Sequence, residues 1–186
     1  MRKIFSVVFI LFLSFAGANS QDRLYGGIGY FNVGVNFLNF EKLNQVLSGK
    51  NRAEFKNVLF ATGGGGFAIL GNFMIGGEGF GFIAQKQDKG NYRSVLSGGA
   101  GFFKVGYVAY QTNNLLIYPM LGLGGGGLDL KTFERKTSDF EGGISNPSAF
   151  NANFSAFIVD ISGGVDFIPR HWVLGLRVGY LFSPIV

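Results

Sequence analysis

The chain has 186 residues, which is enough for one domain with a full-sized core, and a formal net charge of +5. Its 31 glycine and 22 phenylalanine residues are far above ordinary usage and favour β-structure, while the charge is too small and too dispersed to argue for nucleic-acid binding. The sequence contains no cysteine, which excludes disulfide bonds, thiolate metal sites and a catalytic thiol.

The first twenty residues have the pattern of a secretory signal peptide. Two basic residues are followed by an apolar run over 4–15 and by the small-residue motif Ala16-Gly17-Ala18. We expect cleavage after Ala18 or after Ser20, which removes residues 1–20 and leaves 21–186 as a single domain. An uncleaved anchor is the alternative, but the apolar run is shorter than the roughly 20 residues that cross a bilayer as a helix.

A five-residue motif recurs along the mature chain: Gly-Gly-x-Gly followed by an aromatic residue or leucine. Copies lie at 26–30, 63–67, 76–80, 98–102 and 124–128, with a weaker one at 163–167. A solenoid or propeller needs a constant period, and the intervals here are irregular. The motif therefore indicates one copy in each of several strands.

Seven strands are predicted around these copies, and their connections alternate between short and long. The predicted strands cover residues 24–38, 58–70, 73–85, 93–111, 115–130, 152–168 and 172–183. Gly71-Asn72, Asn113-Asn114 and Pro169-Arg170 are predicted tight turns, whereas 39–57, 86–92 and 131–151 are polar and mostly long. Short turns at one end and long loops at the other are typical of an outer-membrane barrel, with the turns in the periplasm.

The first long connection, 39–57, contains a predicted helix. Leu43, Val46 and Leu47 fall at helical spacing, and Gly49 can end the helix. A short helix over the barrel mouth fits this pattern. The third long connection, 131–151, is charged and contains glycine and proline, and no structure is predicted for it.

Alternation along the strands predicts which face meets lipid. In the last strand the apolar residues fall on one face and Gly175, Arg177 and Gly179 on the other; in the sixth, Asp160, Ser162 and Asp166 oppose an apolar face. The charged residues predicted to point into the barrel and to form ion pairs there are Glu78, Lys104, Asp160, Asp166 and Arg177.

Two finer expectations follow from this pattern. A turn centred on Pro169-Arg170 places Arg177 diagonally across from Asp160, within reach of an ion pair. Ion pairs would fill a barrel of about eight strands, so we expect no open pore. Tyr118, Trp172 and Tyr180 are candidates for the aromatic girdles at the membrane interfaces.

Strand pattern over 24–183 and a last strand with the sequence GLRVGYLF resemble the small outer-membrane β-barrels of the OmpA/OmpX type. The resemblance implies a closed, eight-stranded barrel that serves as an envelope structural protein, an adhesin or a binding surface through its external loops.

The strand count departs from this family, in which the number of strands is even and both ends are periplasmic. Seven strands leave residues 183–186 at the outer face. We expect that the chain is truncated before an eighth strand; the alternatives are a strand overlooked within 39–57 and an edge supplied by a second chain. With its eighth strand the barrel is expected to be a monomer.

Residues suited to catalysis do not cluster in the sequence. His171, the single histidine, lies in a predicted turn without a partner nucleophile or carboxylate. Asp160 and Asp166 are six residues apart on one strand, about 20 Å in extended chain, too far for a carboxylate dyad. No Gly-Lys-Ser/Thr follows the glycine runs, so no phosphate loop is predicted.

The sequence thus predicts an all-β, antiparallel up-and-down transmembrane β-barrel in the outer membrane of a Gram-negative-type cell, without enzymatic activity, cofactor or metal. Its expected partners are membrane lipid and an extracellular ligand or surface, contacted through 39–57 and 131–151, in a structural or adhesive role. One alternative is a narrow pore or carrier for small or hydrophobic molecules. Another is an exported soluble, lipocalin-like binding barrel, in which the apolar face would point inward.

Overall fold

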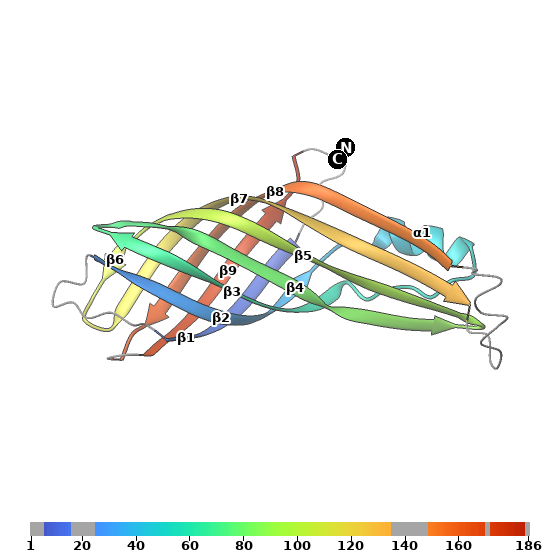
Figure 1. Ribbon diagram of the computed structural model, residues 1–186, viewed down its shortest axis with the longest axis horizontal. Coiled ribbons are helices and arrows are strands. Elements are labelled where there is room, and N and C mark those ends of the chain that lie inside the picture. Colours follow the sequence, from blue (N-terminus) through green and yellow to red (C-terminus); the bar gives the residue numbers. More distant parts are fainter. Residues whose placement is uncertain (1–5, 16–24, 135–148, 170–171, 185–186) are drawn as a thin grey trace.

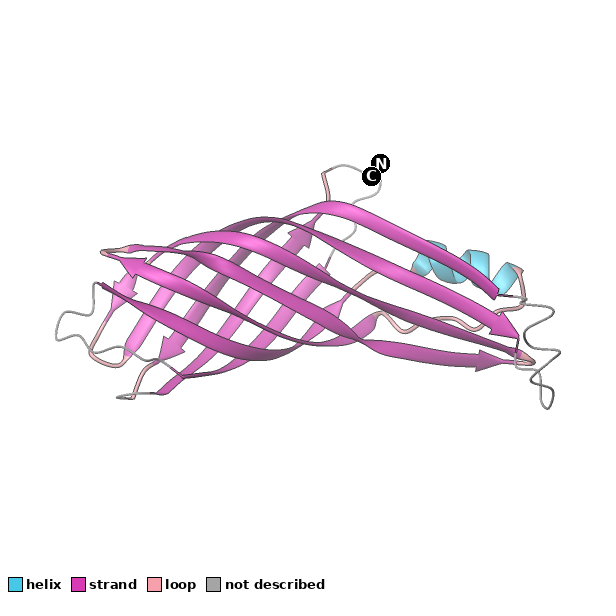
Figure 2. Ribbon diagram, viewed as in Figure 1, coloured by secondary structure: helices cyan, strands magenta, loops and turns pink. Residues whose placement is uncertain are grey.

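The structure is a computed structural model that describes residues 6–15, 25–134, 149–169 and 172–184. These ranges contain one helix and nine strands (Figure 1, Figure 2). In chain order they are β1 (Ser6–Phe15), β2 (Tyr25–Phe37), α1 (Glu41–Gly49), β3 (Val58–Leu70), β4 (Phe73–Lys89), β5 (Tyr92–Tyr107), β6 (Tyr110–Gln111), β7 (Leu115–Glu134), β8 (Ala149–Phe167) and β9 (Trp172–Phe182). No helix in the described part of the chain is long and apolar enough to cross a membrane.

All strands are antiparallel and together close into a barrel. Their order is β5-β4-β3-β2-β1-β9-β8-β7, and β5 also pairs with β7, which joins the two ends of the sheet. The two-residue strand β6 lies alongside β7 and adds no further wall. The predicted all-β, antiparallel, eight-stranded up-and-down architecture is confirmed.

Seven of the eight wall strands agree with the predicted ones to within a few residues, and the eighth lies in an unexpected place. It is β1, formed by residues 6–15 of the segment predicted to be a signal peptide. Strand β1 pairs with β2 from Val7↔Phe37 onward and with β9 from Ser6↔Leu181 onward. The connection 39–57, considered as the place of an overlooked strand, holds α1 instead.

Polarity of the barrel is inverted relative to that of a water-soluble protein, as the alternation predicted. Phe157 and Leu174 are 45% and 48% exposed on the outside, whereas Asp160 and Arg177 are 2% and 3% exposed inside. Large exposed apolar side chains surround the barrel on the described strands β2 to β9, among them Phe31, Phe60, Phe73, Phe103, Leu121, Ile161, Val165, Leu176 and Val178.

The repeated glycine motif provides space for large side chains that point into the barrel. Tyr30 is paired with Gly65 and Tyr118 with Gly164, and a Cβ on either glycine would lie 2.6 Å from the paired tyrosine. The same arrangement recurs at Phe67↔Gly76, Phe80↔Gly63, Phe102↔Gly124 and Leu128↔Gly98. An inward glycine on one strand thus accommodates a ring or a branched side chain on its neighbour.

Two tight turns use glycine in the left-handed region. Gly71 has φ 61° between paired Leu70 and Phe73, so the predicted Gly71-Asn72 hairpin turn is confirmed. Gly90 has φ 58° in the turn of a second hairpin, at a connection for which the sequence predicted a longer polar loop. The connection expected over 86–92 is instead the tip of a long hairpin, because β4 and β5 stay paired as far as Lys89↔Tyr92.

Strands β4, β5, β7 and β8 continue beyond the others at the end that carries α1 (Figure 1). The ladders of β4 with β3 and of β8 with β9 end at Phe82 and Val159, but β4, β5, β7 and β8 remain paired with one another past these points. We call this extension, residues 83–97, 128–134 and 149–158, the projecting sheet. A bulge between Phe82 and Gln85 of β4 lies at its base.

Helix α1 ends at Gly49, and the predicted helix is confirmed. Its Leu47 packs against Leu59 of β3, Leu96 of β5 and Leu130 of β7, which lie on the inner face of the barrel and of the projecting sheet. The Asn44 side chain holds the returning chain through both the N–H and the C=O of Phe55, each at 2.9 Å. The helix therefore covers the mouth of the barrel with an apolar plug.

Candidate functional site

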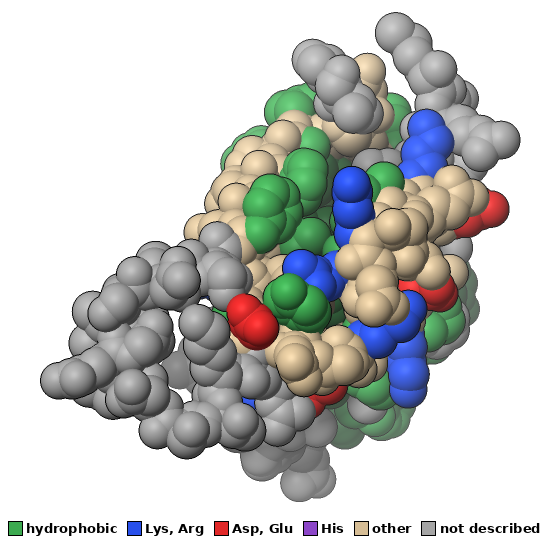
Figure 3. All heavy atoms as spheres, turned by 90° about the vertical axis from the view of Figure 1, so that its right-hand side faces the viewer, with side chains coloured by type: hydrophobic (Ala, Val, Ile, Leu, Met, Phe, Trp, Pro, Cys, Tyr) green, Lys and Arg blue, Asp and Glu red, His purple; other side chains and the backbone are tan. Residues whose placement is uncertain are grey.

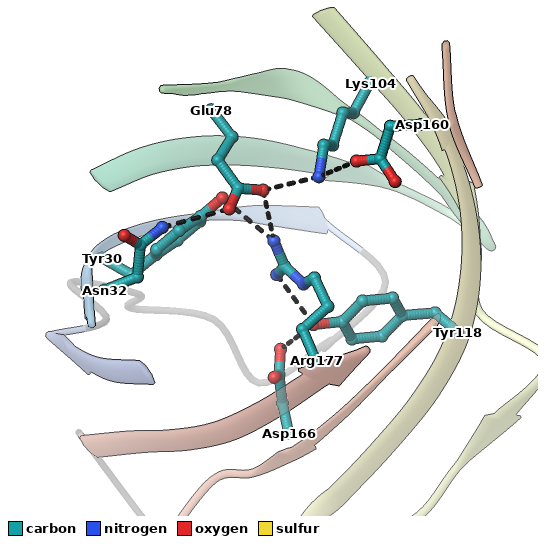
Figure 4. A network of polar contacts seen from close by, with 8 residues as sticks. All are labelled: Tyr30, Asn32, Glu78, Lys104, Tyr118, Asp160, Asp166 and Arg177. Atoms are coloured by element: carbon teal, nitrogen blue, oxygen red, sulfur yellow. Dashed lines mark hydrogen bonds and ion pairs between the residues drawn. The ribbon is translucent and has the colours of Figure 1, made fainter. Parts of the chain in front are cut away.

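A buried polar network crosses the middle of the barrel (Figure 4). It contains all five charged residues that the alternation placed inside, from β4, β5, β8 and β9, and each is at most 4% exposed. Tyr30 and Asn32 of β2 and Tyr118 of β7 complete it. The members are brought together because inward positions of neighbouring strands share one face of the sheet.

Arg177 is the centre of this network. Its Nη1 lies 2.8 Å from Glu78 Oε2 and donates to Tyr30 Oη at 3.1 Å, and its Nη2 donates to Tyr118 Oη at 2.9 Å. The guanidinium also lies over the rings of Tyr30 and Phe67, 5.1 and 5.3 Å from their centroids. A charge with this many partners is held in one position.

Glu78 links the arginine to a second cation. Lys104 Nζ lies 2.8 Å from Glu78 Oε2 and also binds the carboxylate of Asp160. The other carboxylate oxygen of Glu78 accepts a hydrogen bond from Asn32 Nδ2 at 3.0 Å. A buried carboxylate is costly unless it is paired and hydrogen-bonded, and Glu78 has both kinds of partner.

Two sequence predictions about this region are wrong. Tyr118, expected in an interfacial girdle, is 1% exposed and donates from its Oη to Asp166 Oδ2 at 2.9 Å. Inward-facing Gly164 makes room for its ring, so the position is filled from the inside. The expected partner of Arg177 was Asp160, but Arg177 binds Glu78 and Asp160 binds Lys104.

The cause of the second error is the register of the last hairpin. A turn centred on Pro169-Arg170 would set Arg177 opposite Ser162, but the structure pairs Arg177 with Gly164. Asp160 then lies four residues along β8 from that position, about 13 Å at the usual rise of a strand. A shift of two residues keeps every side chain on its predicted face while changing its partner.

Trp172 and Tyr180 were the other girdle candidates. Tyr180 lies half-buried on β9 and its ring stacks on Phe182, with centroids 6.2 Å apart. Trp172 begins β9, and its side chain is outside the described part of the structure, as is the whole of His171. The girdle therefore remains a prediction for these two aromatic residues.

Tyr30 and Asn32 were not predicted as partners, although a signal for them exists. Asn32 stands on the inward face of its strand by simple alternation, and Tyr30 is two residues away on that face. What alternation cannot supply is which inward residues of other strands they meet, because this depends on register between strands.

Apolar layers lie on both sides of the polar network. One cluster of buried residues, including Phe67, Met74 and Met120, packs inside the barrel around it, and the cluster under α1 closes the mouth. Within the described residues no group of three or more His, Cys, Asp or Glu side chains is placed to hold a metal ion. Among the described residues, the inward charges Glu78, Lys104, Asp160 and Arg177 thus pair with one another between apolar clusters.

The projecting sheet carries a second candidate site, on its outer strand. Beyond Val159 the backbone of β8 is paired with β7 alone among the described strands, which leaves residues 149–158 as a sheet edge. Phe150 and Phe154 of this edge are 60% and 55% exposed, although their positions belong to the inner face.

The opposite edge of the projecting sheet is occupied by the returning loop. The Gln85 side chain on β4 exchanges hydrogen bonds with the backbone of Lys56, at 3.1 and 3.2 Å, and also donates to Val58 O. At the hairpin tip Arg93 binds Asp88 through two parallel contacts of 2.8 Å, and these raise the pKa of the Arg93 guanidinium. Among the described residues, the unpaired edge of the projecting sheet is therefore that of β8.

Charged side chains gather at this same end of the molecule, which Figure 3 faces. Exposed basic residues of the α1 loop and the hairpin are Lys42, Lys50, Lys56, Lys86 and Lys89, and exposed acidic ones are Glu41, Glu54 and Asp88. The described connections at the other end, 71–72, 108–114 and 168–169, contain no charged residue. The two ends are chemically distinct.

Comparison with solved structures finds crystal structures of Ail, the attachment invasion locus protein of Yersinia pestis. One matches with 10% sequence identity over 97% of this chain and 96% of that chain, at a TM-score of 0.35. Ail in complex with the heparin analogue sucrose octasulfate matches with the same identity and coverage at 0.39. These values describe a distant likeness in strand arrangement. No protein-family model and no curated protein sequence matches the chain.

Proposed function

We propose that the chain is exported through a cleaved signal peptide and inserts into the outer membrane of a Gram-negative-type cell as a non-enzymatic barrel. In this proposal the α1 end faces outward and binds an extracellular ligand or surface. The observation that carries it is the inverted polarity: apolar side chains cover the outside, and Glu78, Lys104, Asp160 and Arg177 are sealed inside.

Lipid is the environment that suits such an exterior. Soluble monomers rarely expose apolar patches larger than a few hundred Å², whereas here exposed apolar side chains follow the described wall strands from β2 to β9. On β9 it runs through Leu174, Leu176 and Val178 to Tyr180, all on one face of an 11-residue strand. That length matches the 9–11 tilted residues that cross a bilayer.

Orientation follows from the difference between the two ends. In outer-membrane barrels the short turns face the periplasm and the longer, more variable connections face outward. The α1 loop, the projecting sheet and almost all exposed charges share one end, and the turn at Gly71-Asn72 lies at the other. We therefore assign the α1 end to the cell exterior.

The binding role rests on the free edge of β8. An exposed sheet edge can accept an extended segment of a partner through backbone hydrogen bonds, and alternate side chains then set its specificity. Phe150 and Phe154 flank this edge with two exposed rings four residues apart. Substitution of both by serine should abolish attachment of cells that display the protein to a panel of immobilised proteins and glycans.

Phe133→Ser is the matched control, because Phe133 lies on the outer face of β7 in the same projecting sheet and is 38% exposed. If both variants retain attachment, or both lose it equally, the edge of β8 is not the binding site.

Fractionation tests the membrane assignment itself. A barrel in the outer membrane resists extraction by urea, needs detergent for solubility, and migrates faster on gels before boiling than after. The exported lipocalin-like alternative predicts that urea releases the protein into solution. Recovery of the mature chain in the soluble fraction after a urea wash would overturn the proposal.

A further inference from the structure

The outer face of the projecting sheet continues the apolar outside of the barrel wall (Figure 1). Ser94 and Leu96 of β5 are buried on the inner face, so Val95 between them points outward. Lys86 of β4 and Lys131 of β7 are paired with Val95 from its two sides and therefore share its face. Both lysines are exposed. We call these two residues the lysine pair.

The charges around the lysine pair leave this face net positive. Arg93 on the same face binds Asp88 through two contacts of 2.8 Å, which cancels both charges. The other acid of the face, Asp129, accepts a hydrogen bond from Asn153 Nδ2 at 2.6 Å. Among the described residues neither member of the lysine pair has an ion-pair partner. The face therefore has two cations available to an anion.

The height of the lysine pair in a membrane can be measured along β5. At the other end of this strand Tyr107 lies on the same face and is 46% exposed. Its ring packs edge-to-face on Phe73, with centroids 5.6 Å apart, and its Oη accepts a hydrogen bond from Asn72 Nδ2 at 3.3 Å. A tyrosine whose ring meets apolar side chains and whose hydroxyl meets a polar turn is typical of the boundary between hydrocarbon and water.

Val95 lies twelve residues from Tyr107 on this strand. At a rise of about 3.3 Å per residue the two positions are about 40 Å apart along the strand, and a tilt of about 35–45° makes this about 30 Å along the membrane normal. The hydrocarbon core of a bilayer is also about 30 Å thick. With Tyr107 at the periplasmic boundary, the lysine pair lies at the level of the headgroups of the outer leaflet.

The neighbouring strands agree with this level. On the outer face of β4, β5 and β7, no charged residue occurs between the short turns and the base of the projecting sheet. The first charged residues outward are Lys86 on β4, Arg93 on β5 and Asp129 on β7. The apolar surface thus gives way to charge at a similar height on three adjacent strands, as expected where hydrocarbon ends.

We propose that the outer face of the projecting sheet is a lipid-headgroup site, at which Lys86 and Lys131 bind the phosphate groups of anionic lipids in the outer leaflet. Their Cα atoms are two strand spacings apart, about 10 Å, and long flexible side chains can converge on one phosphate above Val95 or hold two neighbouring phosphates. The inference rests on membrane insertion in the proposed function and adds to it a preference for a class of lipid.

Lipid, rather than a soluble anion, is the source of phosphate that the position favours. The lysine pair lies on the face that continues into the membrane, where anionic headgroups are concentrated, and each basic residue near such a surface strengthens binding by about fivefold. A soluble anion would meet only two exposed cations in water, where salt screens the attraction.

A fluorophore beside the lysine pair tests the proposal in vesicles. The chain contains no cysteine, so Ser97→Cys, on the same face and nearer the hydrocarbon, can be labelled at one position. Quenching by brominated phosphatidic acid is compared with quenching by brominated phosphatidylcholine. We expect phosphatidic acid to bind more tightly, and Lys86→Gln with Lys131→Gln to reduce its relative affinity by about fivefold for each lysine. Ile83→Cys, at a 57% exposed position, is a second site for the label.

Lys42→Gln with Lys50→Gln is the matched control, because it removes the same charge from exposed positions of the α1 loop at the same end of the molecule. This variant should keep the preference, as should Lys86→Arg with Lys131→Arg. An equal loss in the two glutamine variants would show a general effect of net charge and would overturn the inference.

Two further outcomes would also overturn it. One is equal quenching of the unmodified lysine pair by both lipids. The other is loss of the preference in inorganic phosphate but not in chloride of the same ionic strength, which would identify a site for a soluble anion. Heat-modifiable migration shows whether each variant has inserted. Insertion without lipid preference defeats this inference alone, whereas failure of the unmodified protein to insert into any vesicle defeats the proposed function as well.

Discussion

At Gly164 the barrel has no room for one methyl group, because a Cβ there would lie 2.6 Å from atoms of the Tyr118 ring. The ring cannot simply turn away, since its hydroxyl is held by both Asp166 and Arg177. Glycine is required at this position for space, and the same reasoning applies to Gly65 beneath Tyr30.

We predict that Gly164→Ala destabilises the barrel by about 1–3 kcal/mol, the usual range for overpacking, and lowers its urea midpoint. Gly163→Ala is the control: its Cβ would meet nothing nearer than the Tyr118 carbonyl oxygen, at 3.6 Å. Equal midpoints for the two variants would show that the ring relaxes freely and that the glycine is dispensable.

Arg177→Leu should destabilise the barrel more strongly. The substitution leaves Glu78 with Lys104 as its cation and removes donors from both Tyr30 and Tyr118, a loss that costs about 3–5 kcal/mol when one member of a buried pair is removed. Unfolding in urea, followed by heat-modifiable gel migration, measures the change.

The double variant Arg177→Leu with Glu78→Gln should recover part of that stability, because it removes the buried charge left behind. If the single and double variants unfold at the same urea concentration, Glu78 is not the partner that matters for Arg177.

At the scale of elements, the sequence predicted what depends on local pattern and missed what depends on neighbours. Strand bounds, strand faces, the helix ending at Gly49 and the turn at Gly71 all follow from alternation, spacing and turn chemistry. The partner of Arg177 did not, because a two-residue change in register preserves every face. The sequence also missed the hairpin of the projecting sheet. Its polar residues are typical of a loop, but the paired backbones of β4 and β5 and the turn at Gly90 show that they form strands.

Helix α1 offers a prediction at this scale. Leu47 is 7% exposed and anchors the helix on the mouth of the barrel. Leu47→Ala should therefore reduce the stability of the docked helix by about 2–5 kcal/mol. We expect faster hydrogen exchange and proteolysis within 41–57, with the barrel wall unaffected. Val46→Ala, at a 65% exposed position on the same helix, should change neither rate.

For the whole molecule, the side chains that point into the barrel bear on whether it is a pore or a closed barrel. The polar network joins residues of β2, β4, β5, β7, β8 and β9 (Figure 4). Apolar clusters lie around it and under α1. About eight strands enclose only enough room for their own side chains. A closed barrel is therefore the expectation, and the narrow pore or carrier stays the alternative that conductance tests.

Purified protein in planar lipid bilayers should show no steady conductance. Leu47→Ala should also stay closed, because the network below α1 remains intact. Steady single-channel currents from the unmodified protein would favour the pore alternative and leave the binding role at the projecting sheet as a secondary activity.

Pairing of inward rings with inward glycines has a consequence for assembly. If one strand slid by two residues, its outer face would be unchanged, but the inward rings would lose their glycines: Phe67 would lie opposite Met74 or Glu78, and Tyr118 opposite Ser162 or Asp166. Hydrophobicity alone cannot distinguish these arrangements. The inward glycines thus favour one register between neighbouring strands when the barrel wall forms.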